Sequence, residues 1–231
     1  MEFPLQEVLA GLRRNPRALF IANPNNPTGT AIGEKELRGI LEAATRTVVV
    51  MDEAYSEFSD FTALPSIHEY PHLFVARTFS KVAGLASLRL GAVMGCAESL
   101  ALVRRAMPPF PVNLAALTAA EAAARDPVRM RRYVAEVKRL RVWVANAFSG
   151  LGVKTYPSAG NFLLADFGPT GPELFRKLER QGILLRDRSK DMGSGFVRVT
   201  MGTSAEMRRL VKIIRKEWKP VAGHGITAKV N

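Results

Sequence analysis

The stretch Val48-Val-Val-Met-Asp-Glu-Ala-Tyr55 places an uninterrupted apolar, largely β-branched run directly before two carboxylates. Apolar runs without alternation are typical of strands that are buried on both faces of a parallel sheet. Similar runs occur at 18–22, 73–76 and 90–94, and residues 34–44 carry apolar side chains at helical spacing. Short buried strands separated by helices predict an α/β protein with a mostly parallel sheet and helices on both faces.

The pattern changes after residue 108, where a long helical stretch over about 128–149 leads into a smaller α+β unit. Strand-like segments there cover 153–156, 162–167, 183–185 and 196–199, and helical segments cover 172–181 and 205–218. We therefore expect a large domain at 1–148, a small domain at 149–219 and a flexible tail at 220–231.

Composition excludes several classes of protein. Of the 231 residues, 47% are hydrophobic, which is too many for a mainly disordered chain. The longest apolar runs are too short to cross a membrane, and the start of the chain does not read as a signal peptide. Cys96 is the single cysteine, and Pro71 interrupts the helical spacing of His68 and His72, so we predict no disulfide and no metal site. We expect a cytoplasmic protein.

The charge balance is strongly basic, with 33 Lys and Arg against 21 Asp and Glu and a net charge of +12. Such a balance is compatible with nucleic-acid binding. However, the densest basic cluster, at 125–141, lies on a helical pattern with an apolar stripe, which favours a solvated helix face. We expect neither nucleic acid nor a membrane as a partner, and keep a basic nucleic-acid binder as a minor alternative.

Polar side chains follow the predicted strands, at the edge where ligands of open α/β sheets bind. Asn23-Pro-Asn-Asn-Pro-Thr-Gly29 follows the first strand, although these residue types also form simple turns. Asp52 ends the next strand, where a buried carboxylate needs a cationic partner; a helix N-cap is the alternative. Lys81 follows a further strand among small and apolar residues, where a desolvated amine becomes nucleophilic. Arg89, eight residues later, can fork onto a phosphate.

Taken together and in order, these motifs resemble the pyridoxal-phosphate-dependent aminotransferases of the aspartate aminotransferase fold type. Within that fold type they are most similar to the histidinol-phosphate aminotransferase family. The resemblance rests on the 23–29 stretch, Asp52-Glu-Ala-Tyr55, the segment from Ser80-Lys81 to Arg89, Asn161-Phe162, Gly182-Ile-Leu-Leu-Arg186-Asp-Arg-Ser and Val197-Arg198-Val-Thr-Met-Gly-Thr203. It implies a homodimeric enzyme that moves an amino group between L-histidinol phosphate and 2-oxoglutarate in histidine biosynthesis.

The resemblance also implies a role for each cofactor-binding residue. Lys81 would form a Schiff base with pyridoxal 5'-phosphate and then shuttle a proton between the substrate's Cα and the cofactor. Asp52 would pair with the pyridine nitrogen and keep it protonated. Tyr55 and Asn26 would hydrogen-bond the ring oxygen.

The remaining predicted site residues bind anionic groups in the family. Ser80 and Arg89 would hold the cofactor phosphate. Arg198 would bind the carboxylate of glutamate or 2-oxoglutarate, for which a planar guanidinium suits better than an amine. Arg186 would help to accept the substrate's phosphate or the distal carboxylate of glutamate, and Asn161 would support that pocket.

Two departures from the family pattern bear on these expectations. Ser87 stands where the family usually has glycine, and it costs stability if that position needs a positive φ or a tight contact. The resemblance also places Met1 inside the family's large domain, so that about the first third of a family chain would precede it. We therefore expect four contiguous central strands with uncovered outer edges, and a chain that has little or no activity by itself.

Two other interpretations remain. The first is another enzyme of the same fold type, either an aromatic amino-acid aminotransferase or a threonine-phosphate decarboxylase. The second is a non-catalytic remnant or partner subunit. The motif around Arg198, together with Leu185-Arg186-Asp187, favours the histidinol-phosphate type over the other enzymes.

Overall fold

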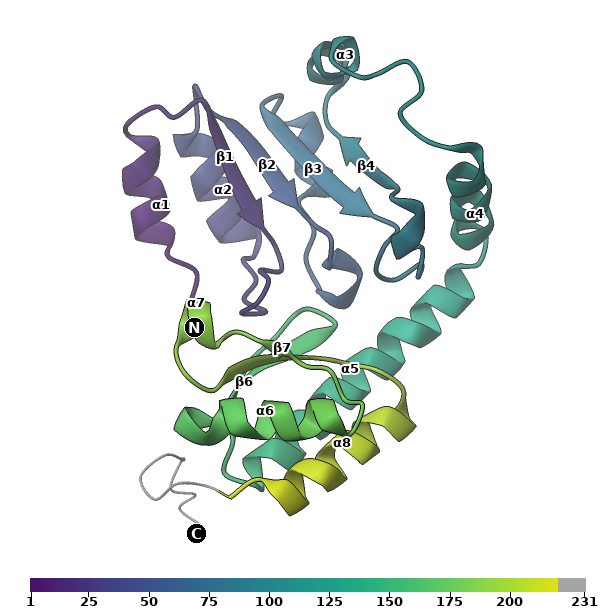
Figure 1. Cartoon of the computed structure of the whole chain (residues 1–231). Helices are drawn as coiled ribbons and strands as arrows, with labels where there is room; N and C mark the ends of the chain where they lie inside the picture. The colour runs from purple at the N-terminus through teal and green to yellow at the C-terminus, as the bar shows by residue number, and fades with distance from the viewer. Residues whose placement is uncertain (220–231) are drawn as a thin grey trace. The chain divides into compact units, whose positions relative to one another are not determined.

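The computed structural model describes residues 1–219, and the chain in it divides into two compact units (Figure 1). The first unit comprises Met1–Asn26 and Thr30–Val134, and the second comprises Pro27–Gly29 and the chain from Ala135 onward. The predicted tail at 220–231 lies outside the described residues.

The division falls inside the long helix α5 (Pro127–Ser149), earlier than the predicted limit at residue 148. The start of this helix packs on the first unit, because the ring of Tyr133 meets that of Phe58 edge-on with 6.0 Å between centroids. Its later buried side chains, from Val137 to Phe148, belong to the second unit. One continuous helix therefore contributes side chains to both units.

The first unit is built on a four-stranded sheet in the order β1-β2-β3-β4. The strands are β1 (Ala18–Ala22), β2 (Val48–Asp52), β3 (Leu73–Thr78) and β4 (Gly91–Met94). The first three are parallel neighbours, and β4 runs antiparallel to β3. The predicted mostly parallel sheet of contiguous strands is confirmed.

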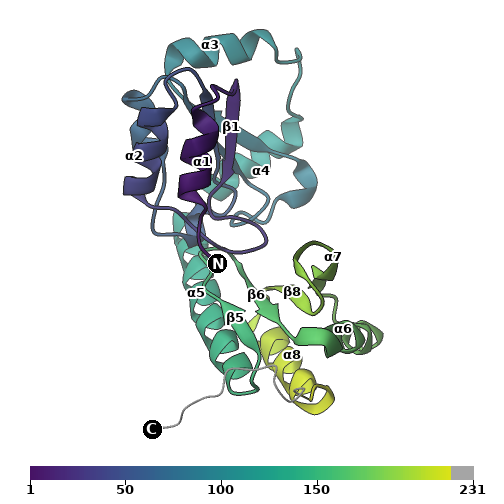
Figure 2. The same ribbon diagram turned by 90° about the vertical axis from the view of Figure 1, so that its left-hand side faces the viewer.

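Two helices cover one face of this sheet, namely α1 (Leu5–Leu12) and α2 (Glu34–Ala43). Because strand side chains alternate between faces, every second residue of β1 to β3 points toward these helices. Those residues are at most 5% exposed and pack against the apolar stripe of α2: Ile21, Val49, Met51, Leu73 and Val75. Figure 2 shows α1 and α2 on the same side of β1.

The opposite face of the sheet is open. Phe20 is 74% exposed, and Val48 and Val93 on the same face are also exposed. Figure 1 looks onto this face, and within the described residues no helix crosses in front of β1 to β3. The α/β class is confirmed, but the helical layer expected on the second face does not cover these strands in residues 1–219.

Short elements complete the first unit. The 3-10 helices η1 (Ser56–Phe58) and η2 (Leu64–His68) follow β2, and η3 (Ala86–Leu88) precedes β4. Two helices follow β4, α3 (Ala97–Arg105) and α4 (Leu114–Ala124). Small residues of α4 pack against Leu90, so this helix supports the segment between β3 and β4.

The second unit is an antiparallel sheet in the order β5-β6-β8-β7, as an α+β domain predicts. The strands are β5 (Lys154–Tyr156), β6 (Phe162–Asp166), β7 (Arg186–Asp187) and β8 (Phe196–Thr200). The helices are α6 (Gly171–Arg180) and α8 (Ser204–Glu217), with short turns η4 (Gly168–Thr170) and α7 (Ser189–Met192). The strand predicted at 183–185 is wrong, because pairing with β8 begins only at Arg186.

A capping box fixes the start of α8 directly after β8. Thr203 Oγ1 accepts the Glu206 N–H, and the Thr203 N–H donates to the Glu206 carboxylate at 2.7 Å. These bonds to Thr203 hold the pKa of the Glu206 carboxyl below its ordinary value. The cap therefore sets where β8 ends and which of its side chains lie beside α8.

Candidate active site

The predicted cofactor-binding residues lie along the carboxyl edge of the first sheet. Because β1, β2 and β3 are parallel neighbours, the loops that follow them emerge at the same edge. Asn26 follows β1, Asp52 ends β2 with Tyr55 three residues later, and Ser80 and Lys81 follow β3. The topology thus gathers motifs that are far apart in the sequence.

Lys81 and Tyr55 lie together at this edge. The Lys81 Nζ sits over the Tyr55 ring, 5.1 Å from its centroid. Tyr55 is 7% exposed, so its ring is a fixed platform, whereas Lys81 is half-buried. An amine above an aromatic face is attracted by the ring's electrons, and this contact orients the Lys81 side chain.

Asn23 anchors the loop that carries Asn26. Its backbone N–H donates to the Asp52 carbonyl at 2.9 Å, and its side-chain Oδ1 accepts the Ile32 N–H at 2.9 Å. Asn23 is buried, whereas Asn26 is exposed. The first asparagine of the motif therefore shapes the loop, and the third lies at the protein surface.

Asp52 differs from its sequence-based interpretation, because its side chain is exposed rather than buried. Its Oδ1 accepts the Ala54 N–H at 3.0 Å, a local bond of the kind an N-cap makes. The buried carboxylate is its neighbour Glu53, which is 1% exposed. The argument that burial demands a cationic partner thus applies to Glu53.

That partner is Arg77 on β3. Its Nε and Nη2 both donate to the Glu53 carboxylate, at 3.1 and 2.9 Å. Thr62 Oγ1 and the Ala63 N–H also donate to Glu53, and Arg77 Nη2 reaches Thr62 Oγ1 at 2.7 Å. Burial raises the pKa of the nearby Glu57 carboxyl, and the charge of Arg77 opposes that rise.

The segment from Ser80 to Arg89 is held by hydrogen bonds between residues that are close in the sequence. The Ser80 N–H donates to Thr78 Oγ1 at 3.1 Å, and Arg89 Nη1 donates to the Ala86 carbonyl at 2.9 Å. Arg89 itself has a left-handed backbone with φ 54°, and its side chain is exposed. Ser87 lies in η3 with no positive φ, so its substitution for the family glycine carries no such backbone strain.

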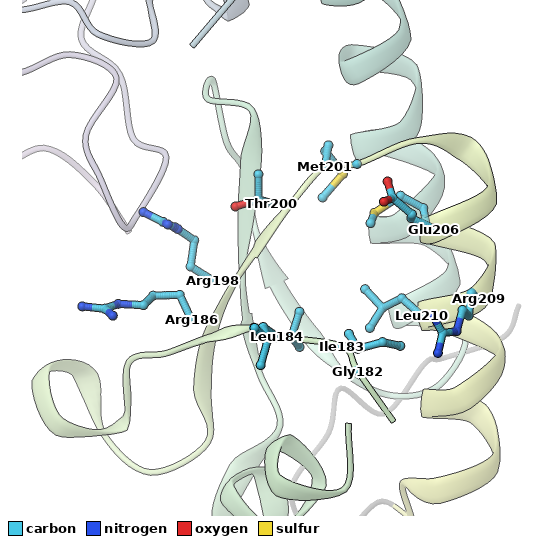
Figure 3. Close-up of a pocket in the computed structure, with 13 residues that line it drawn as sticks. Gly182, Ile183, Leu184, Arg186, Arg198, Thr200, Met201, Glu206, Arg209 and Leu210 are labelled. Carbon is cyan, nitrogen blue, oxygen red and sulfur yellow. The ribbon is translucent and has the colours of Figure 1, made fainter. Parts of the chain in front are cut away.

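Arg186 and Arg198 lie opposite each other in the second unit, because β7 and β8 pair at this register. Figure 3 shows both guanidinium groups projecting to the same side, away from α8. The Arg198 guanidinium stacks over the ring of Phe162, 5.3 Å from its centroid. Like charges on directly opposed strand positions repel, so an anion between them would stabilise the pair.

These arginines border a hollow of about 530 Å³ that continues toward α8. Its other lining residues are mainly apolar: Ile183, Leu184, Leu185, Met201, Met207 and Leu210. Asn161 precedes β6, and its carbonyl accepts the Met201 N–H at 2.9 Å. Asn161 therefore ties the start of β6 to the end of β8.

Sequence reasoning did not assign roles to Asn23, Glu53, Arg77 or Phe162. Asn23, Glu53 and Phe162 lie inside or beside the quoted motifs, and Arg77 is four residues before Lys81. A charged residue in an otherwise apolar strand, such as Arg77, is the one signal that could have pointed to a buried ion pair. Its partner 24 residues away is visible only in the fold.

Residues 1–219 contain neither a membrane-spanning helix nor a metal-binding group of side chains. No helix there is both long enough and apolar enough to span a membrane. In the same part of the chain, His, Cys, Asp and Glu side chains form no group of three that could hold a metal ion.

Comparison with known proteins identifies the family to which this fold belongs. Residues 2–214 match the family of class I and II aminotransferases, and the chain belongs to that family. Among its curated relatives is the histidinol-phosphate aminotransferase of Anaeromyxobacter sp. (strain Fw109-5), which is 41% identical over 207 residues. That alignment covers 86% of this chain and 56% of the relative.

A second relative is histidinol-phosphate aminotransferase 2 of Pseudomonas fluorescens (strain Pf0-1), 38% identical over 92% of this chain and 59% of the relative. The chain thus spans less than three fifths of these relatives. The solved structure of histidinol-phosphate aminotransferase from Sinorhizobium meliloti in complex with pyridoxal-5'-phosphate superposes with a TM-score of 0.82 at 27% identity. It is covered to 61%, and 92% of this chain is matched.

Proposed function

We propose that this chain forms the catalytic part of a pyridoxal-phosphate-dependent aminotransferase that exchanges an amino group between L-histidinol phosphate and 2-oxoglutarate. The observation that carries the proposal is the Lys81 amine above the Tyr55 ring, at the sheet edge where Asp52 lies exposed. The identity to histidinol-phosphate aminotransferases supports the choice of substrate. A homodimer and a cytoplasmic location belong to the same proposal.

The donor set at the carboxyl edge fits this cofactor. An amine, a carboxylate, a phenol, and a serine–arginine pair match the aldehyde, ring nitrogen, ring oxygen and phosphate of pyridoxal phosphate. The Asp52 side chain is exposed, and the Ala54 N–H donates to only one of its two oxygens, Oδ1. When bound, the cofactor supplies a ring that withdraws electrons from the substrate's Cα.

The chain's own residues then have distinct tasks. Lys81 would bind the cofactor's aldehyde carbon and carry a proton to and from the substrate's Cα. Asp52 would hold a proton on the ring nitrogen by charge. Tyr55, Asn26, Ser80 and Arg89 would orient the ring and phosphate, with Tyr55 the most rigid because it is buried.

Arg186 and Arg198 would bind the anionic groups of both substrates. Each guanidinium offers a planar fork that matches a carboxylate or phosphate. Phe162 is buried and gives the Arg198 guanidinium an aromatic surface to pack on. Asn161 would support this arrangement through its bond to Met201.

We further propose that the chain alone transaminates slowly or not at all. The open sheet face supports this, because a sheet with one uncovered apolar face is less rigid and associates readily. Turnover of purified chain saturated with pyridoxal phosphate, comparable with that of a full-length relative, would refute it.

The decisive experiment labels the lysine. Borohydride reduction of the chain with pyridoxal phosphate, followed by peptide mapping, should leave the pyridoxyl group on Lys81. Lys154 offers a matched control, because its Nζ also lies 5.1 Å from a tyrosine ring, that of Tyr156. Lys81→Ala should lose the label and Lys154→Ala should keep it; a label that survives in Lys81→Ala rejects the assignment.

The runner-up is decarboxylation of a phosphorylated amino acid. The solved structure of L-threonine-O-3-phosphate decarboxylase from Porphyromonas gingivalis superposes with a TM-score of 0.78 at 26% identity. A catalytically competent full-length relative that carries these residues should release no carbon dioxide from threonine phosphate. Release at the rate of glutamate turnover would favour the decarboxylase.

A further inference from the structure

The ion pair between Glu53 and Arg77 joins the ends of β2 and β3, the two strands that lead to Asp52 and to Lys81. Glu53 is the residue after Asp52, and Arg77 is four residues before Lys81. The side chain of Glu53 is fully buried and that of Arg77 is 30% exposed. The Glu53 N–H also donates to the Ala76 carbonyl at 2.8 Å, so backbone and side chain both join β2 to β3 at this point.

The carboxylate is held on every side. It accepts two bonds from Arg77, one from the Ala63 N–H and one from the Thr62 hydroxyl, which lies within reach of both carboxylate oxygens. Arg77 closes the triangle by donating to Thr62 Oγ1. Four donor groups around one carboxylate restrict it to a single orientation, and this restrains the backbone of the preceding residue, Asp52.

A buried ion pair of this kind is not expected to add much to the free energy of unfolding. Removing two charges from water is costly, and apolar side chains of similar volume commonly give equal or greater stability. An apolar pair would not fix the relative position of the two strands as closely, because dispersion contacts allow small shifts. A bidentate guanidinium–carboxylate pair requires one defined geometry. The gain from this pair is therefore geometric.

We propose that Glu53 and Arg77 are positioning residues that set the separation between the Asp52 carboxylate and the Lys81 amine. They would act through the ends of β2 and β3 rather than by contact with the cofactor, and the Thr78 hydroxyl, which accepts the Ser80 N–H, links β3 to the loop of Lys81. The inference rests on the proposed function, because it assigns Asp52 and Lys81 to opposite ends of one cofactor.

The test uses the whole chain with Arg77→Lys, which keeps the charge and loses the fork, and Glu53→Gln, which keeps the shape and loses the charge. Arg38→Lys is the matched control, because its pair with Glu69 is exposed. Each variant is first melted, to establish that it folds. Amide hydrogen exchange is then measured without cofactor. In a separate experiment, borohydride labelling of Lys81 is measured at a limiting pyridoxal phosphate concentration.

Both pair variants should raise exchange in residues 78–85 about tenfold while α2 stays at the wild-type rate, and should lower Lys81 labelling about tenfold. Arg38→Lys should change neither measurement. Unchanged exchange at 78–85 in both folded variants, or a uniform rise across the first unit, overturns the positioning role. Absence of label in the wild-type chain rejects the proposed function instead, and the exchange result still decides the role of the pair.

Discussion

Replacing Phe20 or Ile21 by alanine should have very different costs, although the two residues are neighbours in β1. Ile21 is 5% exposed on the packed face, and Phe20 is 74% exposed on the open one. Truncating a buried isoleucine costs about 2–5 kcal/mol. Full burial of a phenylalanine side chain stabilises the folded state by about 1.5–3 kcal/mol. Because only about a quarter of Phe20 is covered, its truncation should lower the free energy of unfolding by about 0.5 kcal/mol.

Urea unfolding followed by circular dichroism measures both costs, and equal slopes for the two variants make the midpoints comparable. Both substitutions lose the same strand preference, so the difference between them isolates burial. Equal costs that persist on tenfold dilution would refute one-sided packing of the sheet. A cost of Phe20→Ala that falls on dilution would mean that a second copy covers the face.

Three further substitutions test separate parts of the chain. Burial raises the folded-state pKa of Glu57, so its contribution to stability is full below the ordinary carboxyl pKa and is lost as the pH rises through the folded value. Glu57→Gln should therefore raise the melting temperature at pH 7, with the gain vanishing near pH 4. The equivalent of Arg198→Lys in a catalytically competent full-length relative should raise the KM for glutamate about tenfold or more, because an amine cannot reproduce the planar guanidinium over Phe162. The lysine equivalent to Lys81 should still be labelled. Unchanged kinetics would remove Arg198 from the substrate site. Gly195→Ala should cost at least about 2 kcal/mol in urea unfolding, since the added Cβ would meet Gly168 and φ is +90°; a wild-type midpoint would contradict the close approach.

The sequence alone determined the class of the fold and the outline of the site. Uninterrupted apolar runs such as 48–51 identify central strands, because only a sheet with apolar surroundings buries them. Polar motifs placed directly after those runs identify the ligand edge, since parallel strands end on the same side. Both inferences use neighbours in the chain.

Tertiary structure decided which side chains are buried and which meet. Asp52 and Glu53 are adjacent carboxylates on opposite sides of the sheet, and Glu53 is buried because it lies on the helix-covered side, where Arg77 of the next strand pairs with it. Phe20 reads as a core residue, yet its exposure depends on what packs over a whole face of the sheet. Arg186 and Arg198 become neighbours through strand register. These outcomes depend on contacts between distant segments, and a local pattern carries no information about which segment will supply the partner.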